Sequence, residues 1–415
     1  MTAVSSAVAA DVAAAALTSR TRFLDGADDP LAGFEPGGFA WLRQGSGLAT
    51  SGVAARLRVS LDDAPGRVAA LLAGIDSDDP LGLPGTGPLV VGALPFAPGR
   101  VGELIVPALV TGRTRDGRAW VTETGPAAVP PRPAAPAARE PSRFAVDPTS
   151  GRDEWMSAVE AALARIADGP LAKVVLAREV VIEADRPFAV AAVVDRLRHL
   201  HRSSFTYASG GFVGASPELL VRRRGDRVIS QPMAGTVPRG ETVSDDRRLS
   251  RRLESSAKDL SEHRLVVDAI LAALGPMCRS LYAGDGPEVV RLATVSHLAT
   301  TVTGRLHPAE PAPTALDLAR LLHPTPAVGG LPRSSALAAI AALERFDRGL
   351  YAGPVGWVDS RGDGDWAVAL RCATLHGASA RLAAGAGIVA GSDPATEWTE
   401  TQAKLEPMLH ALVRP

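Results

Sequence analysis

Apolar and polar residues follow two different rhythms along this chain of 415 residues. Short apolar runs separated by glycine, proline and aspartate predict β-strands within residues 38–61 and 87–122. Segment 155–168 instead repeats its apolar residues at helical spacing and stops at Gly169, which predicts a helix. The β-branched run 173–184 (KVVLAREVVIEA) predicts a central or half-buried strand. Because strands and helices mix without strict alternation, the pattern favours an α+β fold with antiparallel sheets over a doubly wound sheet.

A segment rich in proline and alanine, residues 125–141, divides the chain and has the composition of a linker or an extended surface crossing. We predict a variable N-terminal part, 1–140, that completes the fold, and a region 141–415 that carries the chemistry, together forming one integrated domain. The alanine-rich residues 1–20 lack a basic first segment, and Asp11 interrupts their apolar run. We interpret them as a helical or frayed leader rather than an export signal.

Composition narrows the class of protein. The hydrophobic share of 46% supports a sizeable core, and the formal net charge of −1 gives no electrostatic reason to expect nucleic acid or an anionic membrane as a partner. The two cysteines, Cys278 and Cys372, are too few for a disulfide scaffold and fit reduced thiols in a cytoplasmic protein. No apolar stretch is long enough to span a bilayer.

Two charged residues lie next to apolar strand-like runs and are candidates for acid–base chemistry. Lys173 opens the run 173–184, and a buried lysine that can lose its proton near neutrality can act as a general base. The alternative is a lysine at a strand end that extends its ammonium to solvent. Glu218 lies between Pro217 and an apolar pair, where partial burial would raise its pKa and make it a proton donor. Its alternative is a turn glutamate paired with one of the arginines at 222–224.

Two later segments predict helices from their N-terminal signals. Ser256, three residues before Asp259, matches an N-cap arrangement, and Asp393 followed by Pro394 matches an N-cap and a first helical residue.

Each of these helices carries two carboxylates three residues apart, on one face. They are Asp259 and Glu262 in the first helix and Glu397 and Glu400 in the second, with Lys404 one turn beyond Glu400. Two such pairs facing each other would repel unless a cation lay between them. Hard carboxylate oxygens without a histidine–cysteine cluster point to Mg²⁺ rather than zinc. The alternative is two solvated faces with local ion pairs.

Other residues offer groups for an anionic ligand. Glycines around Gly385, Ala386 and Gly387 allow close backbone approach to a carboxylate. Arg371, in an apolar strand, presents a fork that suits a carboxylate, and Tyr351 could donate its hydroxyl to the same ligand. A buried ion pair and ordinary core packing are the alternatives for these two side chains.

A bend at Gly235 and Thr236 and a histidine, His297, complete the candidates, although His297 fits a hydrogen-bonded core histidine equally well. The sequence contains no GxGxxG after a strand, no Walker lysine loop, no GxSxG elbow and no CxxC.

Taken together and in order, nine segments resemble the chorismate-utilising enzymes over roughly residues 150–410. The segments are KVVLAR, GASPELL, PMAGTVPRG, SAKDLSEHRLVVDAI, SHLATTVTG, LHPTPAVGGLPR, YAGPVGW, DWAVALR and GAGIVAGSDPATEWTET. The resemblance implies a single α/β sandwich, in which helices cover two stacked, mostly antiparallel sheets. It also implies chorismate as the small-molecule substrate.

Three positions indicate a branch of that family. Members that add water use a lysine at the position of Lys173 as the base, whereas members that add ammonia lack it. Aminodeoxychorismate synthases carry a nucleophilic lysine where this chain has Ala234. Segment 323–332 (HPTPAVGGLP) is similar to isochorismate synthases of the menaquinone or siderophore type.

The resemblance implies a role for each candidate. Lys173 would activate the water that attacks C2 of chorismate, and Glu218 would protonate the departing C4 hydroxyl. Glu262 and Glu400 would hold Mg²⁺, with Asp259 and Glu397 in its outer shell. The remaining candidates would bind the substrate: Gly235, Thr236, His297, Tyr351, Arg371, Gly385, Ala386, Gly387 and Lys404.

Two alternatives stay open. One is a salicylate synthase or an aminating synthase component, and the other is a non-catalytic protein that keeps the fold. For the leading interpretation we expect a monomer without a glutaminase partner.

Overall fold

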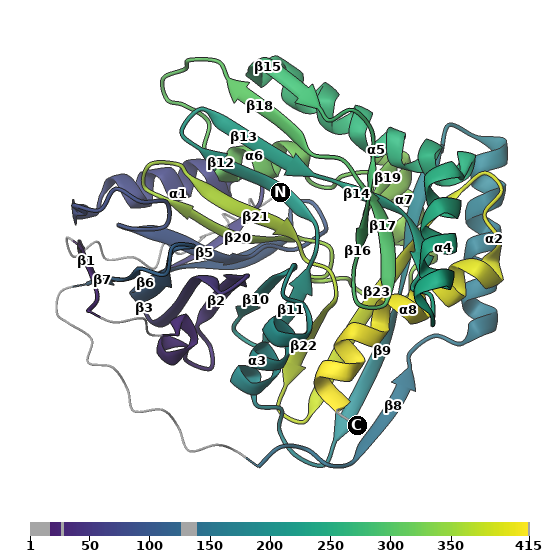
Figure 1. The fold of residues 1–415 in the computed structure, drawn as a ribbon, viewed down its shortest axis with the longest axis horizontal. Coiled ribbons are helices and arrows are strands. Elements are labelled where there is room, and N and C mark those ends of the chain that lie inside the picture. Colours follow the sequence, from purple (N-terminus) through teal and green to yellow (C-terminus); the bar gives the residue numbers. More distant parts are fainter. Residues whose placement is uncertain (1–16, 26–28, 126–138, 414–415) are drawn as a thin grey trace, which may run out of the picture.

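Two long paired strands, β3 (Ser46–Ser60) and β6 (Val101–Arg113), belong to both sheet layers of the molecule (Figure 1). The computed structural model describes residues 17–25, 29–125 and 139–413. The free side of β6 pairs with β5 (Leu89–Ala93) along its first half and with β7 (Ala119–Thr124) along its second. Within the described residues, the 20 connected strands therefore divide into two arms at β6.

The first arm runs from β5 to the upper edge of Figure 1. Its strands, in spatial order after β5, are β20 (Pro354–Asp359), β21 (Gly364–Val368), β12 (Leu219–Arg224), β13 (Arg227–Gln231), β18 (Val302–Leu306) and β15 (Cys278–Ala283).

The second arm runs from β3 to the lower edge of Figure 1. Its strands after β3 are β2 (Phe39–Arg43), β10 (Phe205–Ser209), β11 (Phe212–Ser216), β22 (Cys372–His376), β23 (Ser379–Val389), β9 (Lys173–Ala184) and β8 (Phe144–Pro148). β19 (Gly330–Leu331) also pairs with β9, while β1 (Thr18–Phe23) and β4 (Asp76–Asp78) follow β7. Among the described pairs only β1–β4 is parallel, so the predicted α+β fold with mostly antiparallel sheets is confirmed.

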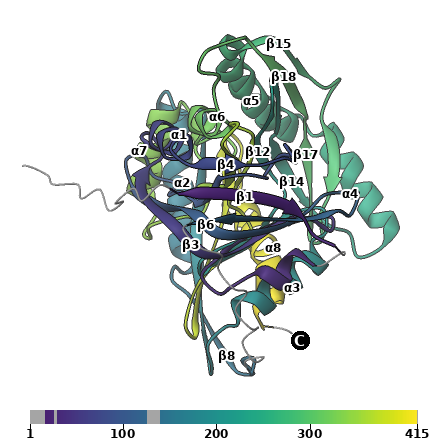
Figure 2. The same cartoon turned by 90° about the vertical axis from the view of Figure 1, so that its left-hand side faces the viewer.

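A separate three-stranded sheet and the helices enclose these layers (Figure 2). The small sheet contains β14 (Met233–Pro238), β17 (Val295–Ala299) and β16 (Glu288–Arg291). The helices are α1 (Ala64–Ala73), α2 (Arg152–Asp168), α3 (Val190–Leu200), α4 (Val243–Ser255), α5 (Ala257–Leu274), α6 (Ala315–Leu322), α7 (Arg333–Leu343) and α8 (Pro394–Val413). α5 packs on β14, and α8 packs on β23, which places the two predicted acidic helices near β9. None of the described helices is long and apolar enough to cross a membrane.

The main core lies between the two arms. It joins side chains of the first arm, such as Leu219 and Trp357, to side chains of the second, such as Leu176 and Phe212. A second core packs α3 and the end of α8 on the outer face of the second arm. Because both faces of that arm are covered, β9 and β23 contain few exposed positions.

The chain changes arms at two neighbouring points. Between β11 and β12 it passes through Pro217 and Glu218, and between β21 and β22 it returns through Arg371. The two crossings are joined by backbone hydrogen bonds, because Val368 N donates to Glu218 O (3.2 Å) and Ala215 N donates to Arg371 O (3.1 Å). The topology therefore brings Glu218 and Arg371 to the same end of the sandwich.

Several local predictions are confirmed. The strand predicted at 173–184 is β9, α2 ends just before Gly169, and Ser256 caps α5 by accepting from Asp259 N. Asp393 caps α8 before Pro394 by accepting a hydrogen bond from Thr396 N.

Two local predictions are wrong. Thr18–Phe23 is a strand because it pairs with β7, so the predicted leader does not extend through residue 20. Arg371 lies outside any strand, because the chain leaves β21 at Val368 and turns at Arg371 with φ +50°. Most of the predicted leader and of the proline-rich crossing lies outside the described residues.

A buried charge cluster joins β12 to β21, the two strands next to the crossings. Asp365 accepts from Arg222 Nε (2.8 Å) and from Arg224 Nη2 (2.6 Å). Burial alone would raise the pKa of Asp365, but the charges of Arg224 and Arg222 outweigh burial and lower it. This stabilisation is therefore present above the ordinary carboxyl pKa of about 4 and is lost as the pH falls below it.

We expect Asp365→Ala to lower the free energy of unfolding by about 3–5 kcal/mol, because it leaves two partly buried guanidinium groups without their carboxylate. Urea denaturation at pH 7 measures this change. The control is Asp226→Ala, which removes an exposed carboxylate from Arg279 and Arg305. Equal effects of the two substitutions would contradict the importance of the buried cluster.

Candidate active site

Lys173, the first residue of β9, is fully buried, and its Nζ lies 2.9 Å from Glu262 Oε1 on α5. Lysine is rarely buried without a partner, and this carboxylate is the partner that the sequence did not reveal. The alternative that Lys173 extends its ammonium to solvent is therefore wrong.

The facing strand β23 leaves room for this ion pair because it lacks a side chain at Gly387. A Cβ atom at Gly387 would overlap Glu262 Oε1 and would lie 3.2 Å from Lys173 Cε. A Cβ atom at Gly385 would stand 2.8 Å from Leu176 O and 3.2 Å from the Tyr351 hydroxyl. Ala386 alternates to the other face and packs in the core, so only its two glycine neighbours border the cavity.

Glu218 presents a second buried carboxyl at the crossing between the arms. Burial raises the pKa of Glu218 to about 7, although the positive charges of Lys173, Arg371 and Lys404 oppose the shift. Its backbone is fixed by a hydrogen bond from Glu218 N to Ser216 Oγ (3.2 Å). The alternative of a turn glutamate paired with residues 222–224 is wrong, because Arg222 and Arg224 pair with Asp365 and Arg223 with Asp363.

The pKa of Glu262 is shifted in the opposite direction. Burial alone would raise the pKa of its carboxyl, but the charge of Lys173, with smaller contributions from Lys404 and Lys258, lowers it. The cavity therefore holds one carboxyl poised to carry a proton, Glu218, and one held as a carboxylate.

The acidic face of α8 contributes Glu400, which borders the same cavity as Glu262. Lys404, one turn later, pairs with Glu400 and donates a hydrogen bond to Gly385 O (3.0 Å). The two acidic helices thus meet in one cavity, as the sequence interpretation required.

The other two predicted carboxylates lie behind the cavity wall. Glu397 is buried and pairs with Lys258 (3.0 Å), and its pKa is raised by burial and by the neighbouring charge of Glu400. Asp259 packs against β14, where a Cβ atom at Gly235 would lie 3.0 Å from Asp259 Cβ. Gly235 has φ +75° and interrupts the register of β14 with β17, so it forms a bulge rather than a turn.

The donor set fits a hard divalent cation. Glu262 and Glu400 reach one cavity from two helices and present carboxylate oxygens, the ligands that such a cation prefers. No group of three or more His, Cys, Asp or Glu side chains among residues 17–25, 29–125 and 139–413 is arranged to hold a metal ion. Oxygen atoms of a bound ligand or water would have to complete the coordination of such an ion.

His297 and Arg371 form a fixed polar pair. Arg371 Nη2 donates to His297 Nε2 (3.0 Å), so the ring hydrogen lies on Nδ1, which approaches Gly235 O (3.2 Å) and Thr236 Oγ1 (3.0 Å). Burial, with the adjacent Arg371 charge, lowers the pKa of His297 well below its usual value. A neutral His297 therefore aims the Arg371 guanidinium.

The cavity is lined by residues of β9, β23, β14, α5 and α8 and of the two crossings between the arms. It brings together most of the predicted candidates, namely Glu218, Gly235, Thr236, Glu262, His297, Tyr351, Arg371, Gly385, Gly387, Glu400 and Lys404. Sequence reasoning missed the apolar part of the lining, Val175, Pro217, Met233, Ala327, Val328 and Leu370. Ala327 and Val328 belong to segment 323–332, whose similarity to isochorismate synthases marked the segment but gave these two residues no role.

This arrangement combines groups for acid–base chemistry on a small anion. A ligand could exchange protons with Lys173 and with Glu218. Its carboxylates could be bound by Arg371 and Lys404, and Tyr351 could donate a hydrogen bond to it. Glu262 and Glu400 supply negative charge for a cation.

Comparison with known proteins agrees with this geometry. The family described as "Chorismate binding enzyme" matches residues 127–413. Isochorismate synthase DhbC of Bacillus subtilis (strain 168) is 40% identical over 336 residues, which cover 78% of this chain and 81% of the relative. Putative isochorismate synthase MenF of Mycobacterium tuberculosis is 43% identical over 342 residues, which cover 79% of this chain and 87% of the relative.

Solved structures show the same fold. A putative 2,3-dihydroxybenzoate-specific isochorismate synthase, DhbC from Bacillus anthracis, superposes with a TM-score of 0.80 at 33% identity, over 93% of this chain and 99% of the other. MenF, the menaquinone-specific isochorismate synthase from Escherichia coli, gives 0.79 at 27%, over 96% and 95%. The family match covers well over half of the chain, and the identities extend over most of its length. The chain therefore belongs to the chorismate binding enzyme family.

Proposed function

We propose that this protein is a Mg²⁺-dependent isochorismate synthase, which adds water at C2 of chorismate and releases the C4 hydroxyl. Two observations carry the proposal: a buried lysine, Lys173, forms an ion pair with Glu262 in the cavity lining, and a buried carboxyl of raised pKa, Glu218, borders the same cavity. The relatives named isochorismate synthase support the same reaction. The product would enter menaquinone or siderophore synthesis.

The two groups have complementary tasks. Lys173 takes a proton from the attacking water, for which it must be a free amine, so its pairing with Glu262 must weaken before the step. Glu218 carries a proton near neutral pH and delivers it to the departing hydroxyl, while the ring double bonds shift. One water is consumed at C2 and one water is released from C4, so the isomerisation needs no oxidant and no ammonia-supplying partner.

The remaining residues bind and orient the dianionic substrate. Arg371, aimed by neutral His297, and Tyr351 hold the enolpyruvyl carboxylate together with the backbone around Gly385. Glu262 and Glu400 would hold Mg²⁺, and the ion would supply Lewis-acid stabilisation of negative charge on the substrate. Asp259 and Glu397 orient the ligands from behind the wall.

Product analysis tests the proposal. Chorismate is incubated with the protein and Mg²⁺, with and without ammonium, and the products are separated and identified by mass. Isochorismate as the only product in both cases supports the proposal. Salicylate with pyruvate would identify a salicylate synthase, an amino product would identify an aminating enzyme, and absence of turnover would favour a non-catalytic protein.

We expect Lys173→Ala to lower kcat about 10²–10⁴-fold while chorismate still binds, because the general base is removed. Lys173→Arg is the matched control, since arginine keeps a positive charge beside Glu262 but does not release its proton. The base role requires both variants to be inactive. If Lys173→Arg retained the wild-type kcat, the lysine would act only as a charge.

The pH profile tests Glu218. The acid must be protonated, and the pKa of Glu218 is about 7, so kcat/KM should fall as the pH rises through this value. Glu218→Gln should be slow and should lose this descending limb. A wild-type kcat/KM that increased from pH 6 to pH 8 would rule out Glu218 as the acid.

Magnesium titration tests the two carboxylates. We expect Glu262→Gln and Glu400→Gln each to raise the Mg²⁺ concentration for half-maximal activity about 10-fold or more, because each removes a charged ligand. Glu406→Gln is the control, since Glu406 is an exposed residue of the same helix. An unchanged Mg²⁺ requirement in the first two variants would place the ion elsewhere.

A further inference from the structure

A second buried ion pair lies directly behind the wall of the active-site cavity. Glu344 and Arg348, between α7 and β20, have side chains that are each only 3% exposed. Arg348 Nε donates to Glu344 Oε2 (2.9 Å), and Arg348 Nη2 donates to Glu344 Oε1 (2.5 Å). Neither side chain borders the cavity, so neither has a place in the proposed chemistry.

The pair holds backbone groups of two cavity walls. Arg348 Nη1 donates to Val328 O and Nη2 donates to Val175 O, both at 2.8 Å. Glu344 Oε1 accepts from Ala177 N at 2.7 Å. Val175 and Val328 border the cavity, on β9 and on the loop before β19.

These bonds occur where β9 has an incomplete strand partner. On this side, β19 pairs only with Lys173 and Val174, and β8 begins to pair at Val180. Between them the Glu344–Arg348 pair does what a strand would do, since it satisfies Val175 O and Ala177 N. It acts two residues beyond Lys173.

Arg348 also contacts a third wall. Its guanidinium lies 4.3 Å from the ring centroid of Phe96 and 5.8 Å from that of Tyr351. Tyr351 N donates to Arg348 O at 2.9 Å, and the Tyr351 side chain borders the cavity. One guanidinium therefore connects β9, the loop at Val328 and the Tyr351 segment.

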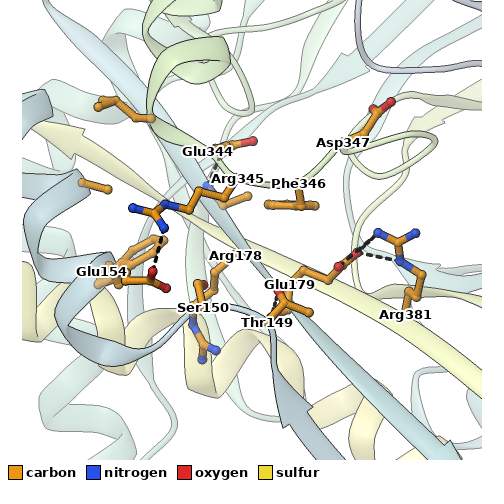
Figure 3. A pocket seen from close by; sticks show the side chains of 14 residues that line it. Thr149, Ser150, Glu154, Arg178, Glu179, Glu344, Arg345, Phe346, Asp347 and Arg381 are labelled. Atoms are coloured by element: carbon orange, nitrogen blue, oxygen red, sulfur yellow. Dashed lines mark hydrogen bonds and ion pairs between the residues drawn. The ribbon is translucent and has the colours of Figure 1, made fainter.

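Glu344 also borders a separate pocket, in which other charged side chains form ion pairs (Figure 3). There Arg345 pairs with Glu154 at 2.8 Å and Arg381 pairs with Glu179 at 2.8 Å. The Glu344 carboxylate is directed to the backbone of β9 instead.

Stability alone is a weak explanation for this pair. Replacing a buried ion pair by apolar side chains of similar volume is often neutral or stabilising, whereas removing one partner is strongly destabilising. Apolar side chains could fill the space but could not form hydrogen bonds with Val175 O, Val328 O and Ala177 N.

We propose that Glu344 and Arg348 are positioning residues, which hold the walls formed by Val175, Val328 and Tyr351 at the spacing that the substrate ring requires. The inference rests on the proposed function, because it assigns these walls to chorismate. Displacement of a wall by about 1 Å is sufficient to reduce a rate about 100-fold.

The test is the double variant Glu344→Met with Arg348→Met, assayed with chorismate at saturating Mg²⁺. We expect a lower melting temperature, because three buried backbone groups lose their partners, but also an unchanged Mg²⁺ requirement and a kcat/KM of the folded protein lowered about 100-fold. Wild-type kcat/KM in the folded double variant would overturn the proposal. A purely structural pair would lower the melting temperature and leave the kcat/KM of the remaining folded protein unchanged.

A conservative variant covers the case in which the double variant does not fold. Arg348→Lys keeps the charge beside Glu344 but cannot reproduce the planar fork that reaches both carbonyl groups. We expect it to fold and to lower kcat/KM, and wild-type kcat/KM would overturn the proposal. The matched control is Glu154→Gln with Arg345→Met, which removes an exposed neighbouring ion pair but keeps an oxygen to accept from Gly151 N, and which should change neither quantity.

Chorismate affinity separates this proposal from the proposed function. If the wild-type protein binds chorismate but makes no isochorismate, the proposed reaction fails, and weaker binding by the double variant still supports positioned walls. Suppose instead that the wild type is active and that the double variant binds chorismate as tightly as the wild type does. In that case a lower kcat of the double variant is the result that supports the positioning role. Unchanged affinity and unchanged kcat together refute it.

Discussion

The burial of the Lys173 ammonium is the constraint on which the rest of the site depends. An ammonium group is stable out of water only beside a compensating charge, and here Glu262 supplies that charge at 2.9 Å. α5 must therefore approach β9 closely, which is possible only because β23 has Gly387 opposite Val175. Burial of one lysine thus constrains the position of α5 and requires glycine at position 387 of the neighbouring strand β23.

The same low-polarity environment gives two carboxyls different protonation behaviour. Glu262 lies against Lys173 and has a lowered pKa, whereas burial dominates at Glu218 and raises its pKa to about 7. Glu218 is close enough to the same lysine to feel its charge but has no ion pair with it. A difference in contact distance, rather than in residue type, separates a candidate ligand from a candidate acid.

Local sequence predicted the elements better than the contacts between them. The β-branched run of β9 and the caps of α5 and α8 are local signals, and the structure contains each of them. The burial of Lys173 depends on Glu262, far away along the chain, so the sequence left two interpretations open. β1 was misread because its pairing with β7 is nonlocal. The φ of +50° at Arg371 is unusual for a residue other than glycine, and nothing in the apolar run around it predicts a break.

Two of the residues that sequence reasoning missed, Val175 and Val328, are held in place through their backbone. Val175 and Val328 border the cavity with apolar side chains that resemble any core valine, and their carbonyl groups carry the bonds that fix them. A glutamate and an arginine four residues apart also resemble an ordinary surface pair on a helix. Glu344 and Arg348 differ from such a pair because the chain leaves α7 at Leu343 and turns both side chains inward, where a strand is missing beside β9. The shape of the cavity therefore depends on charges that never touch it.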